Sequence, residues 1–172
     1  TRSTRPTTNR TETTKTSRPP TEYGYYFIMI PAGFMTGNYV ARHYGRTISI
    51  DNMIAIGASI GVIGIVLALL LQTLGMSSPV ALFLPIALAV FGNGITLPNA
   101  QAAAINEFPE YAGTASGLTG FLQMAVSSVA AQAVALIFNG TVYPLLGLML
   151  VASIISLLIF RWGVLNFKKR TI

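Results

Sequence analysis

Charged residues divide this chain into long apolar segments. Two runs, residues 52–106 and 111–160, contain no charged residue. Each run is long enough for two helices of the roughly 20 residues that cross a lipid bilayer. Turn-forming residues interrupt both runs near their middle, at 75–79 and at 139–144. The pattern therefore predicts four membrane-spanning helices after residue 51.

A further apolar segment lies before the first of these runs. Aromatic residues cluster at its start and arginines follow its end, which is typical of a membrane helix anchored at both interfaces. Proline occurs inside the spans, at Pro31, Pro85 and Pro98, where membrane helices tolerate it and are often kinked by it. We expect an all-α polytopic membrane protein with five transmembrane helices, at about residues 23–41, 53–74, 80–105, 113–138 and 143–160.

The two ends of the chain are polar. Residues 1–22 are rich in threonine, proline and basic side chains and hold almost nothing apolar, so they cannot bury a core. We expect this segment to be a disordered tail and the helical bundle to cover residues 23–165. Residues 166–172 are expected to form a basic cytoplasmic C-terminus.

Charge also predicts the orientation in the membrane. The connections at 42–51 and 107–110 and the C-terminus carry charged residues, whereas those at 75–79 and 139–143 carry none. The positive-inside rule then places the charged ends in the cytoplasm, for a multi-pass protein of a bacterial inner (plasma) membrane. The same alternation places the basic tail outside, against the rule. Either a further helix precedes Tyr23 in the intact protein, or the tail is not its native leader.

Composition supports a membrane protein and argues against other classes. Apolar residues make up 52% of the chain and charged residues only 9%, against roughly 25% charged residues in a soluble domain. The net charge of +6 is spread over segment ends rather than one continuous face, which argues against nucleic-acid binding. Cysteine is absent and His43 is the single histidine, so we expect no disulfide, metal site or cofactor.

The acidic residues give little support to an enzyme. Asp51, Glu107 and Glu110 all lie in predicted loops, so no carboxylate lies within a predicted span. Glu107 and Glu110, beside Tyr111, are the candidates for chemistry at a membrane interface, but acids in a loop are more often simply solvated. No phosphate-binding loop or nucleophile set occurs in the sequence, and enzymatic activity is not expected.

Amides inside the apolar spans are candidate contacts for a substrate. Asn93, Asn99 and Gln101 surround Pro98, and Gln123 lies in the next span. A polar amide in a bilayer is unfavourable unless it faces other helices or a cavity. These side chains therefore either hydrogen-bond between helices or line a substrate pathway.

A short basic loop follows the first span. It contains Gly37, Arg42, Gly45 and Arg46. Arginines at a helix end can bond the last carbonyls and complement the negative end of the helix dipole. The loop either anchors the span at the membrane surface or acts as a conformational loop whose arginines change partners during transport.

Small residues recur at the spacing of helix contacts. Glycines lie three or four residues apart in two of the spans, and such spacing lets helix backbones approach closely. We interpret both sets as packing surfaces first and as sliding interfaces second: Gly57, Gly61 and Gly64, then Gly113, Gly117 and Gly120.

Three stretches of the sequence resemble a known family. They read GYYFIMIPAGFMTGNYVARHYGR, FGNGITLPNAQAAA and FPEYAGTASGLTGFLQM. They resemble the Bcr/CflA family of drug/proton antiporters in the major facilitator superfamily, over about residues 23–165. By this resemblance the five spans correspond to helices eight to twelve of a twelve-helix transporter that works by alternating access.

The resemblance carries expectations about function. It implies the C-terminal part of a multidrug efflux transporter, whose first seven helices and proton-coupling acids lie outside this chain. The implied partners are the lipid bilayer, a small amphipathic drug or metabolite, and protons through the missing half. It places the helix from Gly113 to Gln123 near the bundle interface. Positions 37–46 resemble the C-terminal copy of the superfamily's glycine-rich basic loop, and Ala41 stands where the better-preserved copy of that loop has Asp. The alternative is a short membrane interaction or assembly protein without transport activity.

Overall fold

The structure is a computed structural model that describes residues 20–76, 78–107 and 109–170. These residues form helices joined by short turns, with no β-strand among them, which confirms the all-α class. Residues 1–19 of the predicted tail lie outside the described residues, and the first helix begins at Pro20, before the predicted span. The elements are α1 (Pro20–Phe27), α2 (Met29–Tyr44), α3 (Ile50–Thr73), α4 (Pro79–Glu107), the 3-10 helix η1 (Pro109–Tyr111), α5 (Ala112–Ile137) and α6 (Tyr143–Arg170).

Four of these helical segments are long and apolar enough to cross a membrane. They are α3, α4, η1 together with α5, and α6 as far as Gly163. They correspond to the four spans predicted after residue 51. Helix α6 continues to Arg170, so part of the basic segment expected to follow the last span is helical.

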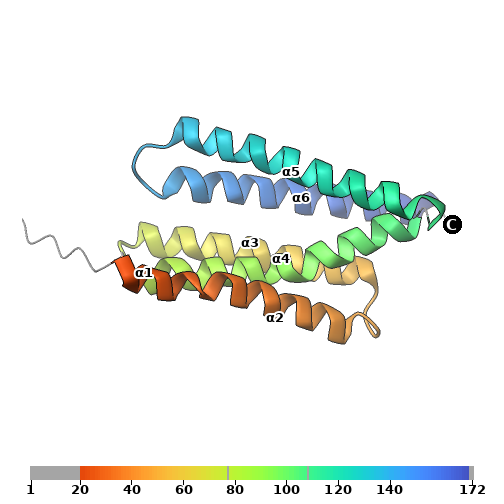
Figure 1. Ribbon diagram of the computed structural model, residues 1–172, viewed down its shortest axis with the longest axis horizontal. Coiled ribbons are helices and arrows are strands. Elements are labelled where there is room, and N and C mark those ends of the chain that lie inside the picture. Colours follow the sequence, from red (N-terminus) through yellow and green to blue (C-terminus); the bar gives the residue numbers. More distant parts are fainter. Residues whose placement is uncertain (1–19, 77, 108, 171–172) are drawn as a thin grey trace, which may run out of the picture.

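The first predicted span is two helices rather than one. Helix α1 ends at Phe27 and α2 begins at Met29, with Ile28 between them (φ −60°, ψ −25°). The cause is Pro31, which has no N–H to donate to the carbonyl of Phe27 four residues earlier. The bonding pattern resumes at once, because the Ala32 N–H donates to the Ile28 carbonyl (3.2 Å). The two helices follow one another along the same side of the bundle (Figure 1), and neither reaches the length of a single span.

The connections at the two ends of the bundle differ in charge. The α3–α4 and α5–α6 turns lie at the end where α1 begins, whereas the α2–α3 and α4–α5 connections and the end of α6 lie at the other (Figure 1). Each uncharged turn contains a glycine with positive φ, Gly75 at 75° and Gly140 at 80°, a conformation that other residues rarely adopt. Charged and uncharged connections therefore alternate between the two ends of the bundle, as expected. Which end faces the cytoplasm stays a prediction.

Helix α4 packs between α2 and α3, and glycines set the spacing. A Cβ at Gly33 of α2 would lie 2.6 Å from the carbonyl oxygen of Ala87. A Cβ at Gly64 of α3 would lie 2.6 Å from the amide nitrogen of Ala89. No side chain fits at either position without moving a helix. Gly61 differs, because a Cβ there would lie 3.7 Å from the nearest atom, an ordinary contact.

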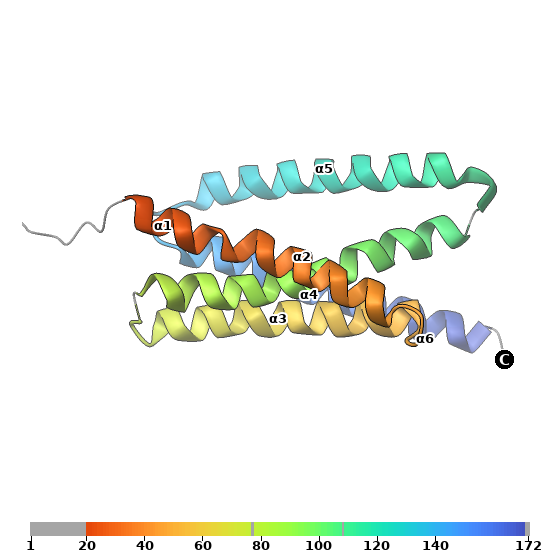
Figure 2. The ribbon, with the colours of Figure 1, turned by 60° about the horizontal axis from the view of Figure 1, so that its bottom comes forward.

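Helices α5 and α6 pack less closely against the bundle than α2, α3 and α4 pack against one another. No residue of α5 is buried, and Leu146 is the buried residue among the described side chains of α6. Helix α6 lies along α3, and the Tyr143 hydroxyl donates to the Gln72 carbonyl at one end (3.1 Å). Figure 2 shows α5 running apart from α2, while the second half of α4 bends towards the start of α5. This second half contains Pro98, whose missing N–H interrupts the helical hydrogen bonds.

Candidate functional site

A cavity of about 270 Å³ lies between α3, α4 and α6. It exists because small residues line much of its wall. Its lining is uncharged, and polar groups reach it from α4 and α6. A ligand there would be held by apolar contact and by neutral hydrogen bonds. The residues that matter for this chemistry are Gly57, Gly61, Asn93, Thr96, Ser153 and Ser156.

Asn93 is the predicted pathway residue that lines this cavity. Its amide can both donate and accept hydrogen bonds. Thr96 lies nearby on α4, and its hydroxyl donates to the Gly92 carbonyl (3.0 Å). The hydroxyl oxygen of Thr96 keeps lone pairs with which to accept a bond. Asn93, which is exposed, and Thr96, which is half-buried, are therefore polar groups about one turn apart on α4.

The other predicted pathway residues do not line the cavity. Asn99 is half-buried, and its Nδ2 donates to the Ile95 carbonyl of its own helix (2.7 Å). Gln101 is half-buried beyond Pro98, and Gln123 is exposed on α5. Six residues separate Asn93 from Asn99, which places them on different sides of a helix that turns every 3.6 residues.

Sequence reasoning missed the contribution of α6. Ser153 and Ser156 line the cavity opposite the α4 amide. Their spacing of three residues places both hydroxyls on one side of the helix. That spacing in an apolar segment was the available signal, but the sequence gives no indication that this side meets α3 and α4.

The basic loop lies at the end of α2. Gly37 is buried, and a Cβ there would lie 3.1 Å from the Cα of Gly94 on α4 and closer still to the Phe91 carbonyl. Arg42, Gly45 and Arg46 are exposed. The structure thus divides the four loop candidates into one packing residue and three surface residues.

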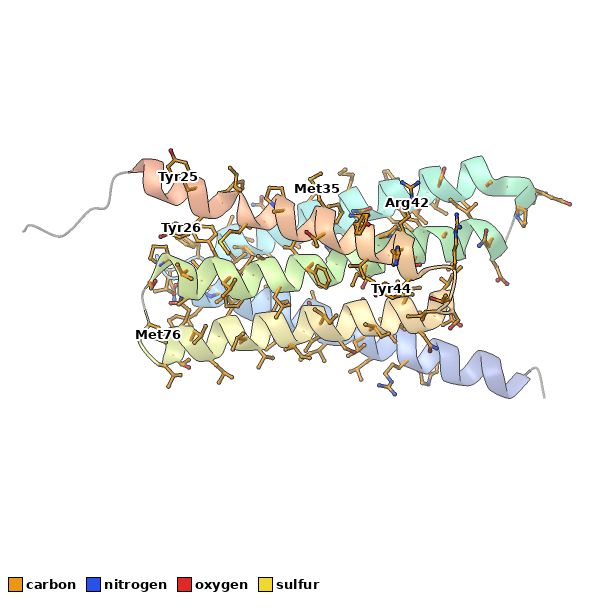
Figure 3. The ribbon with its side chains drawn as sticks, turned by 90° about the horizontal axis from the view of Figure 1, so that it is seen from below. Tyr25, Tyr26, Met35, Arg42, Tyr44 and Met76 are labelled. Atoms are coloured by element: carbon orange, nitrogen blue, oxygen red, sulfur yellow. The ribbon has the colours of Figure 1, made fainter. Side chains whose placement is uncertain are left out.

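Aromatic side chains lie at both ends of the bundle (Figure 3). Tyr26 stacks on Phe83 with 6.2 Å between ring centroids. At the other end His43 lies beside Tyr39 at 6.3 Å and beside Tyr44 at 5.0 Å. Such rings are typical of the membrane–water interface. Within the described residues, no group of three or more His, Cys, Asp or Glu side chains could hold a metal ion.

Comparison with known proteins gives one informative relative. The chain is distantly similar to a bicyclomycin resistance protein homolog. That protein comes from Haemophilus influenzae and is 26% identical over 143 residues, which are 83% of this chain and 35% of the relative. The chain therefore spans about a third of the relative's length. No family model matches the chain, and no solved structure matches it. The relative supports, at a distance, the resemblance to Bcr-type drug-resistance transporters.

Proposed function

We propose that this chain is part of a multi-pass membrane transporter that exports drugs or other small amphipathic molecules. The distant similarity to a bicyclomycin resistance protein homolog carries this proposal. The four long apolar helices support it, because a transporter needs a bundle that spans the bilayer.

The cavity is the place proposed for a substrate group. Asn93 offers an amide, and Ser153 and Ser156 offer hydroxyls, in an uncharged and mostly apolar surrounding. Such a lining suits a neutral molecule with an apolar body and a few hydrogen-bonding groups. Asn99 and Gln101 lie further along α4, outside the cavity, so this proposal rests on Asn93.

Energy coupling is proposed to depend on the rest of a longer protein. Proton-driven transport commonly uses a carboxylate inside the membrane. The acids whose side chains the structure describes lie at helix ends, with Asp51 in the first turn of α3, Glu107 at the end of α4 and Glu110 in η1. In this proposal protons bind outside this chain and drive alternating access. Arg42 and Arg46 then act as the conformational loop, a role supported by their exposure at the end of α2.

Bicyclomycin accumulation in cells that express the complete gene tests the proposal. Expression should lower accumulation, and Asn93→Leu should restore it by reducing the export rate about tenfold, the value of one lost hydrogen bond of roughly 1.4 kcal/mol. Asn139→Ala is the matched control. Asn139 accepts bonds from Thr141 in an exposed turn, so its loss should leave export unchanged.

A second candidate is a membrane interaction or assembly protein without transport activity. The exposure of α5 favours it, because an unburied membrane helix suits binding to another protein. If the complete gene changes the accumulation of no drug while the protein is present in the membrane, the transport proposal fails and this candidate stands.

A further inference from the structure

Each wall of the cavity between α3, α4 and α6 is one face of a helix. On α3, Gly57, Gly61 and Ile65 follow one another four residues apart, so they lie on the same side of the helix. The lining residues of α4 and α6 follow helical spacing as well, and Asn93 and Ser153 lie near the middle of their walls. The cavity is therefore bounded by regular helices on each of these sides.

The cavity lies about halfway along the three helices, which run along the length of the bundle (Figure 1). Gly61, Asn93 and Ser153 are near the midpoints of α3, of α4 and of the apolar part of α6. At 1.5 Å per residue, about 15–20 Å of helix separates them from either end. A charged group is unfavourable at this depth in a bilayer, and every lining residue is uncharged. The cavity therefore suits a neutral occupant.

Gly61 differs from the neighbouring glycines of α3 in what surrounds it. A Cβ at Gly57 would lie 2.7 Å from the Gly92 carbonyl oxygen, and a Cβ at Gly64 would lie 2.6 Å from the Ala89 nitrogen. A Cβ at Gly61 would lie 3.7 Å from the Ala89 carbonyl oxygen, which is an ordinary contact. Alanine would fit at position 61 and favours a helix more than glycine does. Close packing thus accounts for glycine at 57 and 64 but not at 61.

Glycine at position 61 leaves space for the cavity. The residues one turn away on the same side, Gly57 and Ile65, both line the cavity, so a side chain at 61 would project between them. A Cβ at Gly61 meets one atom of the described chain within 4 Å. The cavity of about 270 Å³ is larger than the engineered cavity of about 150 Å³ that binds benzene. A larger side chain at 61 would reduce this difference.

Polar groups are accessible to a molecule in this space. Asn93 and Ser156 are exposed and Ser153 is half-buried, and all three line the cavity. An amide and a hydroxyl can each donate and accept a hydrogen bond. Apolar contact comes from Ile65 and Met149. The lining therefore suits a molecule with one hydrogen-bonding group and an apolar body larger than a single ring.

We propose that Gly61 sets the upper size limit of the neutral molecule that this cavity binds. An amide or hydroxyl of the molecule bonds Asn93 or Ser153, and its apolar body lies against Gly61. Gly61 is then a residue that determines specificity rather than one that holds α3 to α4. The inference rests on the proposed function in taking the bound molecule to be one that is exported, but binding can be measured without transport.

Photolabelling of the product of the complete gene, purified in lipid nanodiscs, tests the binding. The probe is 4-azidobenzamide, which has one ring and a neutral amide, and mass spectrometry locates the label. We expect label in peptides of α3, α4 or α6 that contain lining residues. The charged analogue 4-azidobenzoate should label these peptides at least about tenfold less. Label found only in lipid or in other peptides, or equal labelling by the two probes, would overturn the proposal.

Substitutions at Gly61 test its role in this binding. Gly61→Leu should reduce the labelling roughly tenfold, because leucine occupies the space beside the probe. Gly147→Leu on α6 is the matched control, since a Cβ there meets no atom within 4 Å and Gly147 does not line the cavity. Equal labelling of the two variants would contradict a role for Gly61. If Gly61→Leu does not fold, Gly61→Ala replaces it, because its Cβ makes only an ordinary contact.

Competition by two amides separates a size limit from a general loss of binding. Benzamide has one ring, and 4-phenylbenzamide adds a second rigid ring. Both should displace the label from the unsubstituted protein. In Gly61→Ala, 4-phenylbenzamide should bind at least about tenfold more weakly, whereas benzamide should change little. Equal weakening of both amides, or of neither, would overturn the size limit.

The size limit and the transport function can fail separately. If the complete gene exports bicyclomycin while Gly61→Leu changes neither labelling nor export, the size limit is wrong and the transport function stands. If labelling depends on Gly61 while no drug is exported, the cavity binds a neutral molecule of limited size and the transport function fails.

Discussion

The contact between α3 and α4 can be tested with two glycines on the same helix. A Cβ at Gly64 would lie 2.6 Å from the Ala89 nitrogen and 2.8 Å from the Pro85 carbonyl oxygen. A Cβ at Gly61 would lie 3.7 Å from the Ala89 carbonyl oxygen, which is an ordinary contact. Gly64→Ala therefore requires the two backbones to separate, whereas Gly61→Ala does not.

The expected difference follows from overpacking alone. Both substitutions gain up to about 1 kcal/mol from the higher helix propensity of alanine, so this gain cancels between them. An extra methyl group in a closely packed interface costs about 1–3 kcal/mol, because the surrounding backbone must move. Gly64→Ala should therefore be less stable than Gly61→Ala by about 1–3 kcal/mol, which is roughly a 5- to 150-fold difference in the unfolding equilibrium constant.

Reversible unfolding in mixed micelles measures this difference. Titration with sodium dodecyl sulfate, followed by far-ultraviolet circular dichroism, gives the free energy of unfolding of each variant relative to the unsubstituted chain. Equal shifts for Gly61→Ala and Gly64→Ala would refute the close approach of α3 and α4. A stabilised Gly64→Ala would refute it as well, because helix propensity would then outweigh any steric cost.

Two further predictions concern hydrogen bonds. Pro31→Ala should join α1 to α2, because the new N–H can donate to the Phe27 carbonyl and stabilise the helix by about 1 kcal/mol. Slow hydrogen exchange of the amide at position 31 would show this bond, and rapid exchange would contradict it. Tyr143→Phe should cost about 0.5–1.5 kcal/mol by removing the bond to the Gln72 carbonyl between α6 and α3. Tyr111→Phe, at an exposed tyrosine, is its control in the same unfolding titration, and equal losses would contradict a specific role for Tyr143.

The helical class and four of the spans could be predicted from the sequence because membrane insertion depends on local apolar length. A charge-free run is visible without knowledge of the packing. The division at Ile28 depends on one absent N–H, that of Pro31, and the apolar length of the segment concealed it. The sequence signalled a kink there, but length alone suggested a single helix.

The candidate site was less predictable because it depends on contacts between distant helices. Asn93 was identifiable as an amide in an apolar span. Its grouping with Ser153 requires α6 to pack along α3 so that α3, α4 and α6 line one cavity, which no local pattern specifies. Gln123 was identifiable in the same way, yet it lies on α5 away from the cavity. Residue type thus indicates which side chains need polar surroundings, whereas helix packing decides which of these side chains line the same cavity.

The placement of charge at one end of the bundle also bears on how the protein enters the membrane. The turns at Gly75 and Gly140 join α3 to α4 and α5 to α6, and neither predicted connection carries a charge. Moving a charged side chain through the bilayer centre costs about 2.5–3.5 kcal/mol on insertion scales. In the predicted orientation, each pair would enter as a helical hairpin whose uncharged tip crosses the bilayer, while the charged loops stay on the side of synthesis.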